Sequence, residues 1–535
     1  MEAAESGSPV AEVTERAGKR SGKGGPVDDS FMLVPHGYEQ GARTRVWVGA
    51  HGEQAVDGLW LRCEPLVSEA GDEPPASEPV CRDIPLQLDR QAEGLSFTLV
   101  SVPTAPGCHY RLSLWRSEDR ATGAATVLAH ARCRGKPDSL DQGFNIWYGT
   151  CFYRHTDHGA LTEAFHRLPS HCRPDVSFLG GDQVYLDTAY SNRGLIFTPG
   201  FSTANFSPLL LRSPKKIRRL LNRIFTREYR ETWAGALRNL LSSGHHYFLA
   251  GDHEFWNDYP NPPGFLPTLW SGKVRGIWNE CARKLFDAYQ LPEGKTSSEF
   301  EVGDDLGVFV LDTRLQRGRG RDSQFTDPAT MQRLQDWLKA RRTPGVLVLP
   351  APILTRWQFR GVRSLLVKWG LGDHTLADTG QYETLVRALN DCSQDILILA
   401  GDVHFSRLAR FELNGKQVVE VVSSPLSCLP SAAAAANEEP GSFPDRPAPG
   451  IRAQVEYLKA GTTRRYRRSV ISNNNFVTLN FTRAEAGVAV NVVCWNINAR
   501  NERGELIPDW QSRGLVLRAS SCDQTERTNK NETLS

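Results

Sequence analysis

The chain has 535 residues, of which 40% are hydrophobic and 23% are charged, and its formal net charge is +2. This length allows roughly two to four domains, and the hydrophobic fraction is too high for a disordered chain. The nearly neutral charge balance argues against a dedicated nucleic-acid scaffold. The eleven cysteines are odd in number and form no CxxC pair, so we expect free thiols in a reducing cytoplasm.

The first part of the chain predicts a disordered lead followed by a small β-domain. Residues 1–29 are polar and contain no apolar run, so we expect no secretory signal. No later stretch approaches the roughly 18 apolar residues of a membrane span, and we expect a cytoplasmic protein without a membrane segment. Over 30–136, short runs of alternating apolar residues are separated by Gly, Pro and acidic residues. This pattern predicts a small antiparallel β-sandwich.

From residue 140 the apolar runs become short and continuous, which is typical of central strands buried on both faces. Helical stretches such as 162–168 and 332–341 alternate with them. We therefore predict an α/β catalytic domain over 140–430. The predicted strands of this domain are 144–148, 176–179, 247–249, 308–311, 346–349, 396–399 and 418–422.

The longest predicted helix covers 214–241. Its apolar residues fall on one face, basic residues cluster at its start, Pro214 opens it and Gly244 closes it. After the catalytic domain we predict a flexible basic insertion, C-terminal strands that complete the domain, and a disordered tail. These segments are 431–470, 471–519 (with strands at 476–481 and 488–494) and 520–535.

Three predicted strands end in nearly the same way, with glycine followed by Asp182, Asp252 or Asp402. Glycine lets the backbone turn sharply, and strand C-termini in open α/β sheets converge on one crevice. Carboxylates crowded there repel one another unless cations neutralise them. Because His253 and His404 lie close to two of these aspartates, the pattern predicts metal ligands. Turns and caps without a metal are the alternative.

A metal cluster in this position is suited to phosphate-ester hydrolysis. Metal ions can lower the pKa of a water molecule and clamp the attacking and leaving oxygens of an in-line displacement at phosphorus. A nearby histidine can act as general acid. We therefore expect hydrolysis by metal-activated hydroxide, and the motifs leave open whether the substrate is a diester or a monoester. The chain has no GxSxG or HExxH motif, which argues against a sugar or peptide hydrolase.

The order of five short motifs resembles the PhoD-like (alkaline phosphatase D) branch of the calcineurin-type metallophosphoesterases. The resemblance implies a four-layer αββα sandwich, preceded by an Ig-like β-sandwich, with phosphodiesterase or phosphomonoesterase activity. Gly251 departs from the family pattern, which has a second aspartate there. The motifs span most of the chain and are Gly149–Cys151, Gly181–Tyr185, Asp252–Asp258, Leu311–Arg314 and Gly401–Ser406.

The same resemblance implies a ligand set and its metals. Cys151 and Tyr185 would bind iron(III) as thiolate and phenolate, and Asp182 would bridge to neighbouring calcium ions. Mn, Mg and Zn are alternatives. A buried thiol and a packed aromatic ring are the alternatives for Cys151 and Tyr185. The implied metal ligands are Cys151, Asp182, Tyr185, Asp252, Asn257, Asp402 and His404.

Four further residues are candidates for binding the substrate or transferring a proton to it. His253 would assist the leaving group or hold a ligand in place, and His155 would bind substrate or act as acid. Arg154 and Arg314 would grip phosphate oxygens, since a guanidinium fork fits them bidentately. Surface exposure is the alternative for His155, and salt bridges to the crowded carboxylates are the alternative for the arginines.

Basic clusters at the start of the long helix, at 314–321 and at 464–468 raise the question of a polyanionic partner. If they surround the active-site mouth, they would attract nucleic acid, a phosphoinositide head group or a wall polymer. A solvated surface is the alternative. The rival to an enzyme is a phosphoester-binding or scaffold protein with a degenerate metal site.

Overall fold

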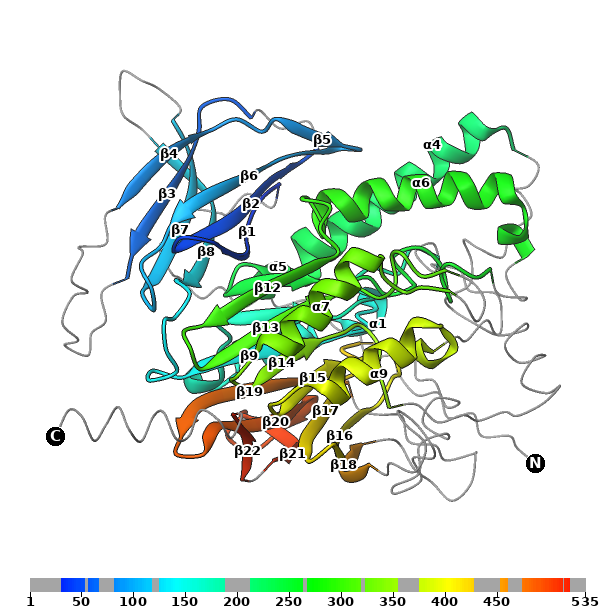
Figure 1. Ribbon diagram of the computed structural model, residues 1–535. Helices are drawn as coiled ribbons and strands as arrows, with labels where there is room; N and C mark the ends of the chain where they lie inside the picture. The colour runs from blue at the N-terminus through cyan, green and yellow to red at the C-terminus, as the bar shows by residue number, and fades with distance from the viewer. Residues whose placement is uncertain are drawn as a thin grey trace, which may run out of the picture.

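The computed structural model describes eleven stretches of the chain (Figure 1). The predicted lead, the predicted tail and most of the predicted insertion lie outside them. Within the described stretches, no helix combines the length and apolar character needed to cross a membrane. The described residues are 30–52, 56–66, 81–117, 125–187, 212–262, 267–318, 323–354, 375–427, 453–459, 474–512 and 514–519.

The N-terminal region contains two antiparallel four-stranded sheets, in the orders β1-β2-β6-β5 and β4-β3-β7-β8. Apolar side chains from both sheets, among them Val46, Leu61 and Leu112, are buried in one shared cluster. This arrangement matches the predicted antiparallel sandwich, while its Ig-like identity stays a prediction. The strands are β1 Phe31–Glu39, β2 Arg43–His51, β3 Leu59–Pro65, β4 Arg82–Leu86, β5 Arg90–Ala92, β6 Leu95–Pro103, β7 His109–Ser117 and β8 Ala125–Arg134.

Two seven-stranded sheets form the body of the molecule. The first has the order β11-β10-β9-β19-β20-β21, with β22 paired to β20, and the second has the order β12-β13-β14-β15-β17-β16-β18. Strands β9 to β11 run parallel, as do β13, β14, β15 and β17. The strands are β9 Phe144–Gly149, β10 Val176–Leu179, β11 His245–Phe248, β12 Ser297–Val302, β13 Leu306–Leu311, β14 Gly345–Val348, β15 Ile396–Ala400, β16 Ser406–Leu413, β17 Lys416–Val422, β18 Gln454–Lys459, β19 Asn475–Ala484, β20 Gly487–Arg500, β21 Leu506–Gln511 and β22 Leu515–Arg518.

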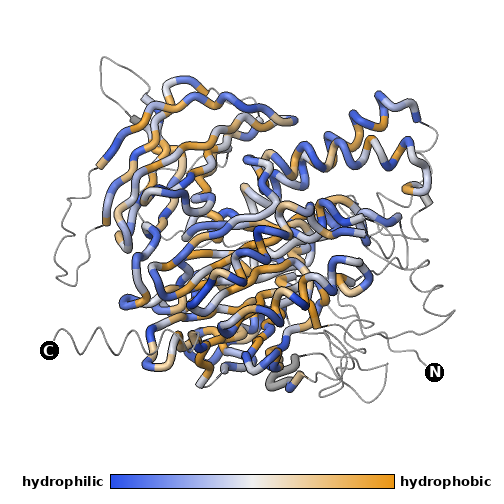
Figure 2. Tube along the Cα trace, in the orientation of Figure 1, coloured by the Kyte–Doolittle hydropathy of each residue, from blue (hydrophilic) through white to orange (hydrophobic). Residues whose placement is uncertain are grey.

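Helices cover the outer faces of these sheets. One apolar cluster joins the inner faces of the two sheets, a second packs α4 and α6 against the first sheet, and a third packs α7 and α9 against the second. The strands of the body are accordingly rich in orange in Figure 2, while blue and orange alternate along α4 and α6. The helices are α1 Arg154–Asp157, α2 Ala160–His166, η1 Ser170–Cys172, α4 Pro214–Arg230, η2 Glu231–Ala236, α5 Arg238–Leu241, η3 Pro267–Trp270, α6 Gly272–Tyr289, α7 Pro328–Ala340, η4 Leu376–Asp378 and α9 Gln381–Asp391.

The predicted strands of the body are all present, but the long helix predicted over 214–241 is not continuous. It breaks into α4, the π-helix η2 and α5. The amide of Leu237 donates to the carbonyl of Thr232, five residues earlier, at 2.8 Å. Trp233, inside the π turn, stacks on Phe248 of β11 with ring centroids 5.0 Å apart. A single wide turn of this kind leaves little trace in a 3.6-residue pattern.

Local capping explains a second difference from the predicted elements. The helix expected at 332–341 begins earlier, as α7 at Pro328. The carboxylate of Asp327 accepts a hydrogen bond from the amide of Thr330 at 2.8 Å. Proline at the first helical position has the required φ and no amide to satisfy. The start of α7 is therefore set by these two residues.

The two large sheets are joined closely where their parallel strands end. The hydroxyl of Tyr148, on β9, donates to the carbonyl of Leu349, just after β14, at 2.9 Å. Gly401, just after β15, lies so close to Thr150 that a Cβ there would be 2.3 Å from its Oγ1. Only glycine allows this approach. The loops after β9 and β15 are thereby brought together, although they lie 250 residues apart in sequence.

Candidate metal centre

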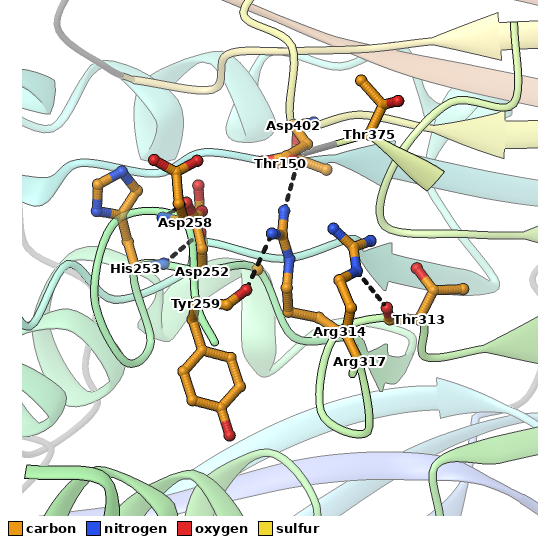
Figure 3. Close-up of polar contacts among 12 residues, drawn as sticks. Thr150, Asp252, His253, Asp258, Tyr259, Thr313, Arg314, Arg317, Thr375 and Asp402 are labelled. Atoms are coloured by element: carbon orange, nitrogen blue, oxygen red, sulfur yellow. Dashed lines mark hydrogen bonds and ion pairs between the residues drawn. The ribbon is translucent and has the colours of Figure 1, made fainter. Parts of the chain in front are cut away.

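The chemically active side chains lie on loops that follow strand C-termini in both large sheets. Cys151, Asp182 and Asp252 follow β9, β10 and β11 of the first sheet. Arg314 and Asp402 follow β13 and β15 of the second sheet. Figure 3 shows Asp252, Arg314 and Asp402 gathered at this edge. The predicted convergence of three Gly-Asp turns is therefore present in the structure.

Several of these residues have strained backbone conformations. Cys151, Asp182, Asp402 and His404 have φ angles of 60°, 58°, 71° and 57°. Side chains other than glycine rarely adopt this left-handed region, and such residues concentrate at functional sites. These turns follow the strand C-termini and bring the donor atoms of Cys151, Asp182 and Asp402 within 4.8 Å of one another.

Two overlapping groups of donor atoms could hold metal ions. One consists of Cys151, Asp182 and Asp402, and the other of Asp182, Asp252 and His253; within each, the ligand atoms lie within 4.8 Å of one another. The hydroxyl of Tyr185 donates to Asp182 at 3.4 Å. Asp182 belongs to both groups and so lies in a bridging position. Thiol, phenol, imidazole and carboxylate donors together suit borderline and hard metal ions.

The electrostatics of the centre also fit a bound cation. Burial and the neighbouring Asp252 raise the pKa of Asp182 well above its usual range. Burial and Asp182 raise the pKa of the Cys151 thiol to about 12. Burial opposes ionisation of Asp252, but the charges of His253 and Arg314 lower its pKa to about 2. The protein's own cations thus stabilise one carboxylate, while a metal ion would be needed to hold Asp182 and Cys151 ionised together.

His253 is held by the carboxylate of Asp187, a residue that the sequence analysis does not identify. Its Nδ1 lies 2.9 Å from Oδ1 of Asp187, which is fully buried. Its ring stacks on Tyr185 with centroids 4.2 Å apart. Burial disfavours the charged imidazole, but Asp187, Asp252 and Asp182 raise its pKa well above the usual value. Asp187 and the stacked ring of Tyr185 therefore hold His253 in a fixed orientation in the wall of the centre.

Arg314 forms the opposite wall. Its Nη2 donates to Asp402 at 2.7 Å, and its Nη1 donates to the carbonyl of Tyr259 at 3.2 Å (Figure 3). Arg317 lies beside it and donates from Nε to the carbonyl of Thr313 at 3.1 Å. Burial and the charge of Arg314 lower the pKa of Arg317 to about 9. Two guanidinium groups are thus buried next to the donor groups.

The structure places Arg154 and His155 further from the donor atoms. Arg154 pairs with Glu228 of α4 at 2.9 Å and with Glu231 at 2.8 Å. These partners are helix carboxylates rather than the crowded ones of the centre. The ring of His155 lies 5.1 Å from that of Tyr153, which in turn lies 5.3 Å from that of Tyr185. Two ring contacts thus connect His155 to Tyr185, the phenol beside Asp182.

The remaining predicted ligands lie at its edges. Asn257 donates from Nδ2 to Asp258 at 2.5 Å, and the amide of Asp258 donates to Asp252 at 2.5 Å. The amide of His404 donates to the hydroxyl of Ser424 at 3.2 Å. The charge of His404 and a hydrogen bond from it counteract the raised pKa of Cys151. His404 therefore lies close enough to join the group around Cys151.

A buried carboxylate, Glu254, shapes the loops that carry the donors. It accepts hydrogen bonds from the amides of Asp182, Gln183 and Gly251 at 3.0, 2.6 and 2.9 Å. Asp312 does the same for the amides of Ala250, Arg314 and Leu315. Both acids lie inside motifs singled out in the sequence, but nothing in their spacing reveals which distant amides they bind.

Packing explains the glycine at position 251. A Cβ there would lie 2.0 Å from Oδ1 of Asp182 and 2.6 Å from its amide nitrogen. The departure from the expected aspartate therefore coincides with close contact between the loops after β10 and β11. Any side chain at this position would displace Asp182, the residue shared by both donor groups.

No protein-family model and no curated protein matches the chain. Among solved structures, that of PhoD matches with a TM-score of 0.56 at 12% sequence identity, over 96% of this chain and 98% of that one. The purple acid phosphatase PPD1 from yellow lupin (Lupinus luteus) seeds is 10% identical, with a TM-score of 0.48 over 89% of this chain and 73% of that one. The expected likeness to PhoD is therefore confirmed at the level of the fold.

Proposed function

We propose that this protein is a metal-dependent phosphoric ester hydrolase of the PhoD type. The observation that carries the proposal is the pair of overlapping donor groups that share Asp182, at the strand ends of a PhoD-like fold. Bound metal ions would supply Lewis acidity and an activated water there. The N-terminal β-sandwich would correspond to the Ig-like domain of that family.

The donor set divides naturally between two kinds of metal ion. Cys151 and Tyr185 would bind a strongly Lewis-acidic iron(III) as anionic thiolate and phenolate ligands. Asp252 and Asn257 offer oxygen ligands suited to calcium or another divalent ion, while Asp402 would add a carboxylate to the group around Cys151. Asp182, which lies within reach of both groups, would bridge them, and His404 would complete the set.

Other residues would act on the substrate. His253, held by Asp187 at 2.9 Å, would donate a proton to the leaving-group oxygen, since the carboxylates of Asp187, Asp252 and Asp182 outweigh burial and raise its pKa. Arg314 would bind a phosphoryl oxygen while keeping Asp402 in place. Arg154 and His155 would contact the part of the ester that leaves.

The test compares hydrolysis of paired chromogenic phosphate diesters and monoesters after chelation and after add-back of iron, calcium or other divalent metals. We expect chelator-sensitive turnover that metal restores, and loss of at least 100-fold in kcat for Asp402→Ala. Asp391→Ala, at the end of α9 and outside the centre, should keep wild-type activity. Turnover that survives both chelator and Asp402→Ala would refute the proposal. Metal-loaded protein that binds phosphate esters without cleaving them would favour the scaffold alternative.

A further inference from the structure

A cationic groove runs along α4, between this helix and the turn that joins β5 to β6. Its volume is about 910 Å³. Figure 1 shows α4 and α6 extending side by side from the body, with the end of the β5–β6 hairpin directed toward them. Six cationic and two anionic side chains line the groove, together with two polar residues and one glycine. The lining residues are Glu93, Gly94, Lys215, Arg218, Arg219, Asn222, Arg223, Thr226, Arg227, Arg230 and Glu231.

The basic residues form a regular stripe on one face of α4. Five of them recur every three or four residues, which is the spacing of one helical face, and Arg218 lies beside this row; the five are Lys215, Arg219, Arg223, Arg227 and Arg230. The opposite face, including Ile217, Leu221 and Phe225, is buried in the core. From Lys215 to Arg230 the stripe extends about 22 Å at 1.5 Å per residue. Because the apolar face of α4 packs on the core, the basic side chains face solvent along the whole helix.

Most of this charge is not neutralised by the protein. Arg218 pairs with Glu280 at 2.5 Å, and Arg227 pairs with Glu231 at 2.8 Å. No carboxylate in the described stretches forms an ion pair with Lys215, Arg219, Arg223 or Arg230. Because the whole chain has a net charge of only +2, this positive charge is a local concentration.

The second wall of the groove is fixed. Gly94, at φ +66°, brings the β5–β6 turn so close to α4 that a Cβ there would be 3.4 Å from Cγ2 of Thr226. Glu93 pairs with Lys284 of α6 at 3.4 Å. Arg90 donates to the carbonyl of Pro292 at 2.8 Å. The turn is thus attached to the helical layer, and the groove does not depend on a loose surface loop.

The shape and lining of the groove select among anionic ligands. The groove follows about 22 Å of α4 and is open to solvent along its length. Charges spread over four helical turns suit a linear polyanion better than a single phosphate. Five of the six cations are arginines, whose forks bind phosphate oxygens bidentately. Among the residues that the structure describes, none that lines the groove is aromatic, so contacts would be with the phosphate backbone rather than by base stacking.

We propose that this groove binds the phosphodiester backbone of a single-stranded nucleic acid, without sequence preference. One end of the groove reaches toward the candidate metal centre, since Glu231 lines the groove and also pairs with Arg154 at 2.8 Å, but none of the candidate metal ligands lines it. It is therefore a binding surface beyond the proposed hydrolytic function. With four unpaired cations, log K should fall with log salt at a slope of about −3.

The test measures fluorescence anisotropy of a labelled, phosphorothioate-linked 20-nucleotide strand with the full-length protein at several salt concentrations. The groove variant carries Arg219→Glu, Arg223→Glu and Arg230→Glu. We expect at least a tenfold loss of affinity and a salt slope near −1. A second variant with glutamine at the same positions guards against misfolding caused by charge reversal. The matched control carries Arg333→Glu, Lys339→Glu and Arg387→Glu on α7 and α9, with the same change in net charge, and should bind within about twofold of wild type.

Three results would overturn the proposal. The groove and control variants would lose affinity equally if only net charge mattered. Poly-glutamate of equal charge would compete as well as the oligonucleotide if the groove took acidic peptides. Vesicles containing phosphatidylserine would bind in a groove-dependent way, with no oligonucleotide binding, if a membrane were the partner. Hydrolysis of small chromogenic esters by the groove variant should stay at the wild-type level, which separates this test from that of the catalytic proposal.

Discussion

The buried carboxylate of Asp187 fixes the orientation of His253. Asp187 is completely buried, accepts from the imidazole at 2.9 Å and also accepts from the amide of Asn257 at 2.9 Å. One carboxylate thus fixes both the ring that would protonate the leaving group and the backbone of a candidate ligand. Because its Nδ1 is occupied by Asp187, the Nε2 of His253 is the nitrogen left to face a substrate.

Asp187→Asn should therefore impair hydrolysis in a way that depends on the leaving group. General-acid catalysis contributes about 10² to 10⁴-fold where the departing oxygen needs a proton. We expect kcat to fall by about 100-fold for alkyl phosphate esters and by less than tenfold for nitrophenyl esters. His253→Ala should show the same selectivity. Equal losses for both substrate types would mean that Asp187 only supports the fold.

The effect of a side chain at Gly251 can be compared with that of the same change at Gly276, which has space around it. Gly251→Ala forces a Cβ to within 2.6 Å of the Asp182 amide, so we expect a loss of about 1–3 kcal/mol in unfolding free energy and weaker metal binding. Gly276→Ala, in α6 with nothing within 4 Å, should raise stability by up to about 1 kcal/mol. Urea denaturation of both variants measures the unfolding free energy, and metal titration measures the metal affinity. If Gly251→Ala retained wild-type metal affinity, the contact with Asp182 would be unimportant.

At the scale of elements, the spacing of apolar residues predicts the strands. It does not predict the buried side chains that hold distant loops in place. The apolar runs that became β10 and β15 were visible because strands buried on both faces carry little else. The Gly-Asp turns located the donor residues for the same reason, since each follows a strand. Glu254 and Asp187 were not identified, because their partners lie about 70 residues away in sequence. Local spacing contains no information about such contacts. The π turn in η2 is also not predicted, because one wide turn hardly changes a 3.6-residue pattern.

One buried ion pair ties strands of the second sheet to the loop after β14. Arg407 of β16 and Glu420 of β17 have no exposed side-chain surface and are hydrogen-bonded to each other. Glu420 also accepts from the amides of Ile353 and Leu354 at 2.7 and 3.1 Å. Arg407 donates to the carbonyl of Leu354 at 2.8 Å. The loop that continues β14 is therefore held by side chains of two neighbouring strands.

Removing one partner of this pair should destabilise the protein strongly. Arg407→Met leaves a buried carboxylate uncompensated, and we expect a loss of about 3–5 kcal/mol in unfolding free energy. Combining it with Glu420→Gln should cost less than the sum of the two single changes. Arg387→Ala breaks an exposed pair with Glu383 and should cost less than about 1 kcal/mol. Additive losses in urea denaturation would show that the pair is not coupled.

At the scale of the whole molecule, the interface between the N-terminal sandwich and the body contains buried histidines. His36 and His51 lie on β1 and β2, and His245 and His246 begin β11. The ring of His245 lies 4.1 Å from that of Tyr38, and its Nε2 lies 2.8 Å from the carbonyl of Arg134. Both histidines of β11 are buried in this interface. Burial lowers the pKa of all four.

This interface should make the protein sensitive to acid. Burial lowers the pKa of His245 to about 4, whereas in the unfolded chain it is near 6.5. Between these values the unfolded state binds a proton that the folded state does not, so stability falls as pH falls. At pH 5 one such histidine costs about 2 kcal/mol. Urea denaturation at pH 7 and pH 5 should therefore show a smaller loss for His245→Gln than for wild type, by about that amount.

The comparison between variants is needed because other groups titrate in the same range. Burial raises the pKa of Glu254 to about 7 and also raises that of Asp182, and protonating these carboxylates favours the folded state as pH falls. Only the difference between His245→Gln and wild type isolates the histidine. His166→Gln, exposed on α2, should follow wild type at both pH values. If His245→Gln lost as much stability as wild type between pH 7 and pH 5, His245 would not be the cause of the acid sensitivity.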